Sequence, residues 1–580
     1  MRDEVKQFIS LRDFLLGDPD YNTAKKTFNW PSITKFNWAI DYFDSIAKDN
    51  HEYALIFAEE HGFEKKVTFE QMRRRSNQAA NFFKELGMKK GDRAMLMMDN
   101  SIELYEIILG IMKAGGAIIP AATMLPPEDI ADRINRGNIK FLFINEQYME
   151  RAIKAKDALS LLTNIINVED VYKGESREPV PAMPGTISYR ETSKYKEEYT
   201  PSHETLTSDE LFLFFTSGTT AKPKLVIHTH QYPIGHLTTM YWIGCKKGDT
   251  HYNISAPGWA KHAWSSLYAP WNAQSTIFTY QYKQFNAANV LSMIEKYKIT
   301  TLCAPLSVWK LFLIEDLNKY RFVLREAVSA GEPLNPEIIK KVKEKLGLTL
   351  REGYGQTEST AMIANFRGEK IKEGSFGKVA PGYDLTLVDD ALKEVRPGED
   401  GQLAVLTRPV KPSGLMLGLD DPQKNKEIFR NGYYLTGDVA FRDEAGYFYF
   451  VGRIDDVFKS LDYRISPFEI ESELIVHPAI LEVSVVPTVD ERDRIVPKAF
   501  IVLKPNFSPS KELAYDIFSF IKEHMAPYKR PRVIEFMKTF PKTISAKIIR
   551  KDLKAYDRGL REKGIKGEFE YKESEVLKGK

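Results

Sequence analysis

The chain has 580 residues, 43% of them hydrophobic and 12% aromatic, which excludes a largely disordered protein and predicts two or more domains. Its 82 basic and 79 acidic residues leave a net charge of +3, whereas a nucleic-acid-binding protein would more often carry a clear basic excess. Only Cys245 and Cys303 are present, which excludes a disulfide-rich secreted scaffold. The charged N-terminus and the lack of a long uncharged apolar run favour a cytoplasmic protein without a membrane span.

The first half of the chain alternates helix-like and strand-like segments. LYEIILGIMKAGGAIIP (residues 104–120) predicts a buried helix that ends at Gly115-Gly116 and leads into a short strand. FLFIN (141–145) predicts a strand, VLSMIEKYKI (290–299) a helix and TTLCA (300–304) a further strand. Strands separated by helix-length segments predict an α/β fold with largely parallel sheets.

The character of the sequence changes near GRIDD (452–456), which is polar and has no periodicity. Two strand-like segments follow, EVSVVPTV (482–489) and KAFIVLK (498–504), and then a helix over 512–525. Leu513, Ile517 and Ile521 form one face of this helix, with Phe520 as an alternative member of the stripe. We therefore expect a separate small α+β domain after a hinge in this region.

The segment TSGTTAKPK (216–224) stands between two strand-like runs, LFLFF and LVIHTH. It is not a Walker A loop, because Lys222 is followed by Pro223 and no GK[ST] ending is present. Its glycine, hydroxyls and lysines nevertheless suit phosphate, although by composition alone a flexible linker remains an alternative. The candidate phosphate-binding residues are Thr216, Ser217, Gly218, Thr219, Thr220, Lys222 and Lys224.

Five more motifs follow in order: SAGEP (329–333), YGQTE (354–358), YLTGD (434–438), GRIDD (452–456) and PKTISAKIIR (541–550). Together with the phosphate loop they resemble the adenylate-forming superfamily of acyl-CoA synthetases, nonribosomal-peptide adenylation domains and luciferases. The resemblance extends from about Phe36 to Arg550. GWAKHAWSSLYAPW, VSAGEPLNPE, EGYGQTE and SPFEIE look closest to the medium-chain acyl-CoA synthetases.

The resemblance implies an α/β fold whose large N-terminal domain, residues 36–452, contains two α/β subdomains and a distorted β-barrel. Residues 1–35 would be an N-terminal extension. Residues 453–580 would form a small mobile α+β domain, with the hinge near Asp455.

The implied activity is ATP-dependent acyl-CoA ligation, in which an acid is activated to acyl-AMP with release of pyrophosphate and then transferred to coenzyme A. A carboxylic acid has a pKa of about 4–5 and needs no general base, so the catalytic task is charge neutralisation and positioning. The resemblance assigns this task to Lys547, to Thr357 and to Glu358, which would hold Mg²⁺ with the phosphates. ATP, Mg²⁺ and coenzyme A are thus the expected cofactors and co-substrates.

The remaining nucleotide contacts also come from the resemblance. Asp438 would accept hydrogen bonds from the ribose, and Arg453 would support the ribose or the phosphates. Tyr354 would stack on the adenine, with a buried core tyrosine as the alternative. The residues expected to enclose the nucleotide are Gly331, Glu332, Pro333, Glu352, Gly353, Tyr354, Gly355, Gln356 and Thr357.

In the second step the coenzyme A thiol, with a pKa of about 8.5, needs no dedicated base. The small domain would swing about its hinge, withdraw Lys547 and present the segment around Tyr463. The most important departure from the family pattern is Asp462, where relatives usually have glycine. Ala221 also replaces a usual glycine, in the phosphate loop. The candidate coenzyme-binding residues are Ser460, Asp462, Tyr463, Arg464, Lys522 and Arg530, and for the last three a plain surface charge is the alternative.

The residue before the QTE motif predicts the size of the acid substrate. Acetate-specific relatives place a tryptophan there, whereas this chain has Gly355, so we expect a deeper pocket and an acid of roughly four to eight carbons. Trp259 is expected to be a wall of this pocket. Lys261 either lines it or points away, and Cys303 is a small buried hydrophobe that could also line it.

Several alternatives remain open from the sequence. The acyl group could be transferred to a carrier protein, or the acid could be acetate or propionate. A luciferase-like oxygenase and a non-catalytic nucleotide-binding protein are further alternatives, but retention of Glu358 and Lys547 disfavours the latter. Binding of nucleic acid is not expected, and both a monomer and a homodimer are compatible with the sequence.

Overall fold

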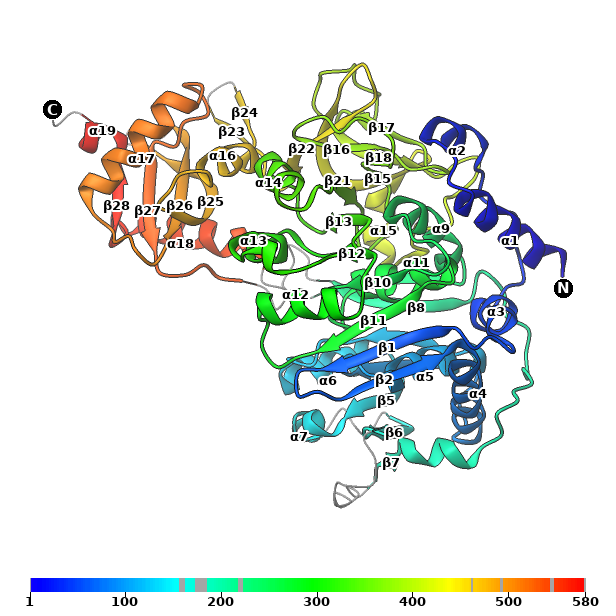
Figure 1. Ribbon diagram of the computed structural model, residues 1–580. Coiled ribbons are helices and arrows are strands. Elements are labelled where there is room, and N and C mark those ends of the chain that lie inside the picture. The colour runs from blue at the N-terminus through cyan, green and yellow to red at the C-terminus, as the bar shows by residue number, and fades with distance from the viewer. Residues whose placement is uncertain are drawn as a thin grey trace. The chain divides into compact units, whose positions relative to one another are not determined.

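A computed structural model describes residues 2–155, 162–172, 185–216, 223–460, 463–490, 494–542 and 547–577 (Figure 1). The chain forms two compact units: residues 1–384 with 406–433, and residues 385–405 with 434–580. The α/β class predicted from the sequence is confirmed. The distorted barrel and the domain boundaries predicted at residues 36 and 453 stay predictions.

The first sheet of the first unit is mainly parallel and has the order β16-β15-β14-β13-β12-β10-β11-β1-β2. Its strands are β1 Tyr53–Glu59, β2 Glu64–Thr68, β10 Thr250–Asn253, β11 Thr276–Gln281, β12 Thr301–Cys303, β13 Glu326–Ala330, β14 Leu350–Tyr354, β15 Ile363–Ala364 and β16 Ser375–Val379. The strand predicted over 300–304 is β12.

The second sheet has the order β19-β9-β8-β4-β3-β5-β6-β7. Its strands are β3 Arg93–Met97, β4 Ala117–Pro120, β5 Ile139–Asn145, β6 Asn164–Val168, β7 Ile187–Ser188, β8 Glu210–Thr216, β9 Lys224–Thr229 and β19 Gly418–Leu419. β8 is parallel to β4 but antiparallel to β9, so the predicted phosphate loop joins an antiparallel pair.

Helices accompany both sheets of this unit (Figure 1). They are α1 Asp3–Leu16, α2 Tyr21–Thr27, α3 Asp44–Ala47, α4 Phe69–Glu85, α5 Ile102–Ala114, α6 Pro127–Arg136, α7 Met149–Lys154, α9 Tyr232–Ile243, α10 Ala260–Ala263, α11 Ala269–Asn272, α12 Ala287–Lys296, α13 Leu306–Ile314, α14 Pro336–Leu346 and α15 Pro422–Ile428, and Trp264–Tyr268 continues α10 as a π-helical turn. The predicted buried helix is α5: the Ser101 side chain caps its start, and Gly115 ends it in a left-handed conformation with φ 82°.

The second unit contains two groups of strands. One comprises β17 Leu385–Val388, β18 Gly401–Leu406, β21 Tyr433–Arg442 and β22 Phe448–Arg453, in that order. The other is a sheet of β25 Ile480–Val489, β26 Ile495–Leu503, β27 Val533–Met537 and β28 Glu570–Lys572. β23 Phe458–Ser460 pairs with β24 Tyr463–Ile465, and the helices are α16 Pro467–Leu474, α17 Lys511–His524, α18 Arg550–Glu562 and α19 Glu573–Val576.

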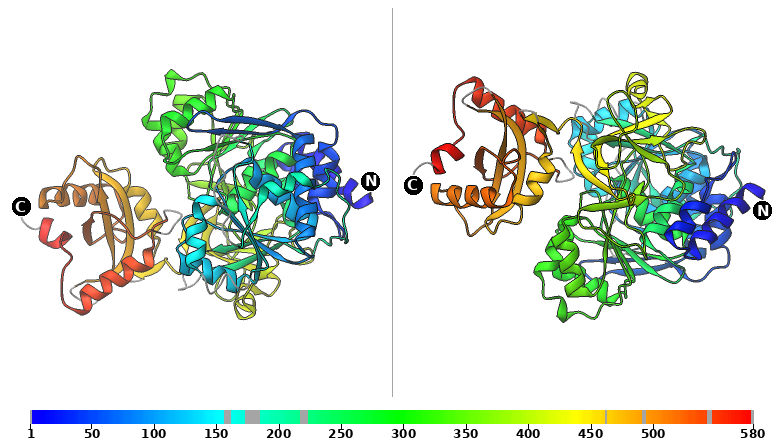
Figure 2. Two further views of the ribbon diagram at one scale, coloured as in Figure 1. Left: turned by 90° about the horizontal axis from the view of Figure 1, so that it is seen from below. Right: turned by 90° about the horizontal axis from the view of Figure 1, so that it is seen from above.

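Helices cover both faces of the β25–β28 sheet, as Figure 2 shows. Alternate residues of its strands face opposite sides, so Val485 packs with the core beside α17, whereas Val486 packs with the core beside α18. The buried stripe of α17 is Ala514, Ile517, Phe518 and Ile521, with Leu513 partly buried beside it. The predicted stripe is therefore confirmed at Ile517 and Ile521, and Phe520 instead stacks on His524.

Within the described residues, no helix is both long enough and apolar enough to cross a membrane.

Candidate active site

Two predicted nucleotide motifs meet at one edge of the first sheet. β13 and β14 are parallel neighbours, with Ala330 paired to Gly353, so the turns that follow them leave the sheet side by side. Gly331 adopts φ 106°, a backbone conformation that favours glycine and starts the turn through Glu332 and Pro333. Ligands of parallel α/β sheets bind at the carboxyl ends of strands, so this edge suits a nucleotide.

Glu352 links these two turns from inside the sheet. The backbone N–H of Leu334, just after the SAGEP turn, donates to Glu352 Oε2 over 3.1 Å. Burial raises the pKa of Glu352 to about 8, and the hydrogen bond only partly opposes this. Glu352 is thus mostly protonated at neutral pH and ties the turns together.

The surroundings of Tyr354, the last residue of β14, and of Gly355, which follows it, differ from those expected of an open nucleotide and acyl site. Tyr354 is half-buried and packs edge-on against Phe376, with ring centroids 5.2 Å apart. A Cβ on Gly355 would lie 2.3 Å from Cη2 of Trp264 and 2.4 Å from the carbonyl oxygen of Thr360. The expectation that glycine leaves open space at this point is therefore wrong, because the Trp264 ring already occupies it.

The QTE loop is anchored on both sides by backbone contacts. Nε2 of His228, on β9, lies 2.7 Å from the carbonyl oxygen of Thr357. Burial lowers the pKa of His228 to about 3, so the ring is neutral, and because a carbonyl only accepts, Nε2 must carry the proton. The N–H of Met416 donates to the carbonyl of Glu358 over 2.8 Å, and the N–H of Gln356 donates to the hydroxyl oxygen of Ser359 over 3.0 Å. Thr357 and Glu358 therefore lie on a fixed, half-buried loop.

The predicted phosphate loop begins and ends at a strand pair. Thr216, the last residue of β8, is paired with Lys224, the first residue of β9. Ser217, Gly218, Thr219, Thr220 and Lys222 lie outside the described residues. Since β9 also carries His228, the strand that leaves this loop is in direct contact with the QTE loop.

In the second unit, the predicted ribose residues form an ion pair. Asp438 on β21 is paired with Arg453 on β22, and Arg453 Nη1 lies 2.8 Å from Asp438 Oδ1. The carboxylate is 4% exposed, whereas the arginine is half-buried and also donates to the carbonyl of Thr436 over 3.2 Å. The pair holds a fixed carboxylate of the kind that accepts hydrogen bonds from sugar hydroxyls.

Lys547 and Asp455 are both exposed in the second unit. Lys547 immediately precedes Ile548, which forms a β-bridge with Lys542. Asp455 lies in the turn after β22, and its carbonyl accepts from Lys554 of α18 over 2.9 Å. The side chain of the next residue, Asp456, is paired with Arg550 over 2.7 Å, so this turn is tied to the start of α18.

The candidate coenzyme-binding residues have mixed surroundings. The Ser460 hydroxyl donates to the carbonyl of Ile495 over 2.7 Å, and Arg530 donates to the carbonyls of Met525 and Lys522 at the end of α17. Tyr463 is 50% exposed and stacks on Tyr528, and Lys522 is exposed. Asp462 and the side chain of Arg464 lie outside what the structure describes.

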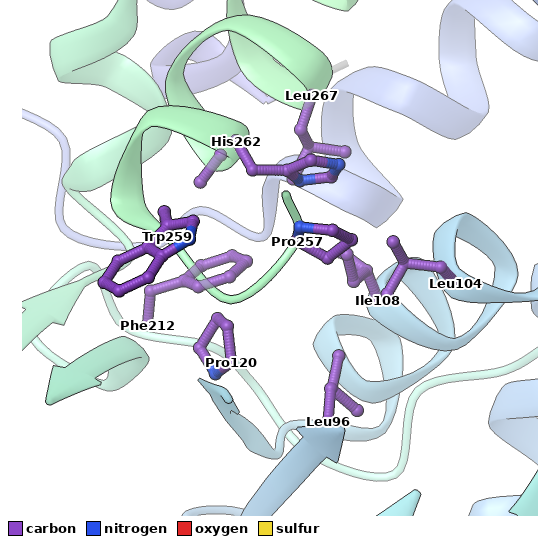
Figure 3. A pocket seen from close by; sticks show the side chains of 10 residues that line it. Leu96, Leu104, Ile108, Pro120, Phe212, Pro257, Trp259, His262 and Leu267 are labelled. Atoms are coloured by element: carbon purple, nitrogen blue, oxygen red, sulfur yellow. The ribbon is translucent and has the colours of Figure 1, made fainter. Parts of the chain in front are cut away.

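A pocket in the first unit contains the predicted wall residue Trp259 (Figure 3). Its lining is Leu96, Leu104, Ile108, Pro120, Phe212, Pro257, Trp259, His262, Ala263 and Leu267. Lys261 is not part of this lining, and its Nζ lies 3.2 Å from the carbonyl oxygen of Ala330, beside the SAGEP turn. Cys303 is buried at the end of β12, as expected of a small hydrophobe, and is likewise not part of this lining.

A family model described as "AMP-binding enzyme" matches residues 43–417, and one described as "AMP-binding enzyme C-terminal domain" matches residues 469–547. The chain belongs to the AMP-binding enzyme family.

Curated members of this family match almost the full chain. The chain is 41% identical to 4-hydroxybutyrate--CoA ligase 1 of Metallosphaera sedula, over 93% of this chain and 94% of that protein. It is 33% identical to the mitochondrial acyl-coenzyme A synthetase ACSM3 of Mus musculus, over 92% of this chain and 93% of that protein.

Solved structures agree. The anthranilate CoA ligase AuaEII in complex with anthranoyl-AMP matches with a TM-score of 0.81 at 28% identity, over 91% of this chain and 98% of that one. The acyl-CoA synthetase of Brucella canis matches with a TM-score of 0.69 at 28% identity, over 95% of this chain and 99% of that one. This AMP-binding enzyme is therefore an acid–thiol ligase that forms an acyl-adenylate and then an acyl-CoA, with ATP and coenzyme A as substrates.

Sequence reasoning missed two histidines of this enzyme. His228 is 129 residues away from Thr357 along the chain, so its contact carries no local signal. His262 lies inside GWAKHAWSSLYAPW, where only the orientation of the short helix α10 brings its ring to the pocket wall. The signal that could have suggested it is a histidine three residues after a predicted wall tryptophan, one helical turn away.

Proposed function

We propose that the enzyme prefers a straight or branched acid of roughly four to eight carbons over acetate. The observation that supports this is the apolar lining beside Trp259. The cavity there is about 10 Å³, so an acyl chain enters only if its walls move apart. Each buried methylene contributes about 0.8 kcal/mol, so every added carbon that fits should improve binding. Fatty acid metabolism is the corresponding role.

In the proposed first step, the chain's own residues position and neutralise charge. Glu358 is half-buried at the nucleotide edge, and a single carboxylate fits Mg²⁺ that arrives with the ATP phosphates, since Mg²⁺ takes one or two carboxylates plus phosphate oxygens. Bound there, Mg²⁺ would neutralise phosphate charge. Thr357 would donate to the α-phosphate, and Lys547 would bridge the carboxylate and the phosphate.

The nucleotide is held, in this proposal, by the strand-end turns and the ion pair. Tyr354 and the Gly331–Pro333 turn enclose the adenine, and Asp438, fixed by Arg453, accepts from the ribose hydroxyls. Thr216 and Lys224 flank the loop that holds the β- and γ-phosphates.

For the second step we propose free coenzyme A as the acceptor, with Tyr463 and its neighbours facing the pantetheine after the small domain moves about Asp455. Transfer to a carrier protein is the alternative. Thioester formation by the purified protein with ATP and free coenzyme A distinguishes them. We place the enzyme in the cytoplasm or a similarly reducing compartment, because Cys245 and Cys303 are both free and buried.

A second candidate acid is 4-hydroxybutyrate. The relative from Metallosphaera sedula is named for it, and the pocket contains one buried imidazole, that of His262, among its apolar side chains.

Pyrophosphate release across a series of acids, with and without coenzyme A, tests the chain-length proposal. We expect kcat/KM to rise from acetate toward the C4–C8 acids, by up to about fourfold per methylene. Acetate as the best substrate would contradict it.

A further inference from the structure

The pocket beside Trp259 contains a polar ring in a wall that is otherwise mostly aliphatic and aromatic. His262 lies on α10, is 3% exposed and contributes its imidazole to the lining. Figure 3 shows the ring next to Pro257 and Leu267, across from Leu104 and Ile108. Placing a polar ring in an apolar wall is unfavourable unless its nitrogens are hydrogen-bonded.

One of the two nitrogens has its partner. Nε2 of His262 lies 3.2 Å from Oδ1 of Asn100. An amide oxygen only accepts, so Nε2 carries the proton and donates it. Burial lowers the pKa of His262 to about 3, which keeps the ring neutral at physiological pH.

The other nitrogen then presents a lone pair. In a neutral imidazole protonated at Nε2, Nδ1 is an acceptor. Among the described residues, no hydrogen bond to Nδ1 is found, whereas the buried His251 has partners at both nitrogens, Thr301 and Ser265. The Nδ1 lone pair therefore remains available to a donor that enters the pocket.

We propose that His262 is a specificity-determining residue that accepts a hydrogen bond from a hydroxyl on the acyl chain, so that the pocket selects hydroxy acids over alkanoic acids of the same size. This rests on the proposed function, in which the pocket holds the acyl chain. A methyl group in place of the hydroxyl cannot donate, so Nδ1 of His262 stays unpaired. A second carboxylate can only accept, so it cannot pair with Nδ1 either.

The test compares three acids that differ at one end: 4-hydroxybutyrate, pentanoate, in which a methyl replaces the hydroxyl, and glutarate, in which a carboxylate replaces it. Acid-dependent pyrophosphate release gives kcat/KM for each. The wild-type enzyme should prefer 4-hydroxybutyrate over pentanoate by at least about tenfold, the factor expected of one net hydrogen bond, and should reject glutarate more strongly. This arm needs no variant and cannot fail through misfolding.

Variants then assign the preference to the ring. In His262→Phe the preference for 4-hydroxybutyrate over pentanoate should fall at least about tenfold, mainly through loss of activity on the hydroxy acid. Asn100→Leu, which releases Nε2 and lets the ring change tautomer, should reduce the preference by less. Ile108→Val, across the pocket from the ring, should change both acids alike and leave the ratio unaltered.

The possible failures are distinguishable. If pentanoate equals or exceeds 4-hydroxybutyrate in the wild type while both exceed acetate, the role of His262 is overturned and the chain-length proposal stands. If the wild type activates neither acid better than acetate, the proposed function itself has failed. A preference that persists in a folded His262→Phe enzyme also overturns the role of His262.

Discussion

Buried ionisable groups are treated in opposite ways at two places in this enzyme, around Lys498 in the second unit and around Glu352 and His262 in the first. Inside the β25–β28 sheet, Lys498 is fully buried and contacts three carboxylates, those of Glu535, Asp557 and Glu570, over 2.6, 2.7 and 2.6 Å. In the first unit, two buried groups are instead kept neutral: Glu352 on β14 and His262 in the pocket beside Trp259. Charges thus compensate one another around Lys498, as they also do between the buried Lys113 and Asp44 in the first unit, whereas Glu352 and His262 are neutral.

The largest effect should come from Lys547, an exposed lysine that is not part of the buried cluster around Lys498. Lys547→Ala should lower acid-dependent pyrophosphate exchange at least about a thousandfold, because the transition-state charge loses its cation. Thermal unfolding should change little, since the side chain is exposed. The matched control is Lys551→Ala, which removes an exposed lysine four residues later; exchange at the wild-type rate in Lys547→Ala would refute the assigned role.

Breaking the buried cluster around Lys498 should instead act mainly on stability. Lys498→Met leaves three buried carboxylates without their shared cation and should destabilise the second unit by about 3–5 kcal/mol. All seven tryptophans lie in the first unit, so their fluorescence reports that unit alone while circular dichroism reports both. We expect an early transition by circular dichroism that is absent from fluorescence, and none in the exposed control Lys522→Met.

The crowded Gly355, just after β14, should be more sensitive to substitution than a glycine in an uncrowded helix. Gly355→Ala forces a methyl against Trp264 and should cost about 1–3 kcal/mol, visible as an earlier fluorescence transition. Gly559→Ala, in α18 with nothing within 4 Å, should instead stabilise by about 0.5–1 kcal/mol. Equal and small effects at both positions would show that Trp264 yields easily.

The last effect concerns pH and separates the two kinds of buried acid. The pKa of Glu352 is raised, so its folded form retains a proton, and its contribution to stability is present below about pH 4.5 and lost as the pH rises through about 8. Glu570 is the opposite case: burial alone would raise its pKa, but Arg561 and Lys498 outweigh burial and lower it, so its contribution is lost in acid.

Glu352→Gln should therefore unfold less readily than the wild type at pH 9, by a smaller margin at pH 6, and about as readily near pH 4. The wild type loses stability between about pH 4.5 and 8, whereas glutamine does not titrate and still accepts from Leu334. Denaturant unfolding followed by tryptophan fluorescence measures this difference. If the difference in stability between the variant and the wild type does not grow with pH, the group that titrates is not Glu352.

The sequence predicts the fold and the motif positions well because these depend on local patterns. Alternating apolar segments yield β5 and β12, and the glycine stop after α5 lies where GG occurs in the sequence. Ordered motifs likewise place Thr357 and Glu358 at the end of a strand.

Contacts between distant segments are not predictable in this way. Trp264, 91 residues away in the chain, fills the space beside Gly355. The deeper pocket expected from glycine at this position is therefore not found there. The three partners of Lys498 come from two further strands and a helix, so KAFIVLK alone gives no indication that its first lysine is buried. The pocket role of His262 depends in the same way on the placement of a four-residue helix.

The contact between His228 and Thr357 has a kinetic consequence. It connects β9, the strand that follows the predicted phosphate loop, to the loop that carries Glu358. The imidazole of His228 stays neutral because its pKa is about 3. Between about pH 5 and 9 this connection does not ionise, so a plot of kcat/KM against pH should contain no inflection from it. Any inflection measured in that range reports the substrates or other groups, and the contact between His228 and the QTE loop is the same on both limbs of the curve.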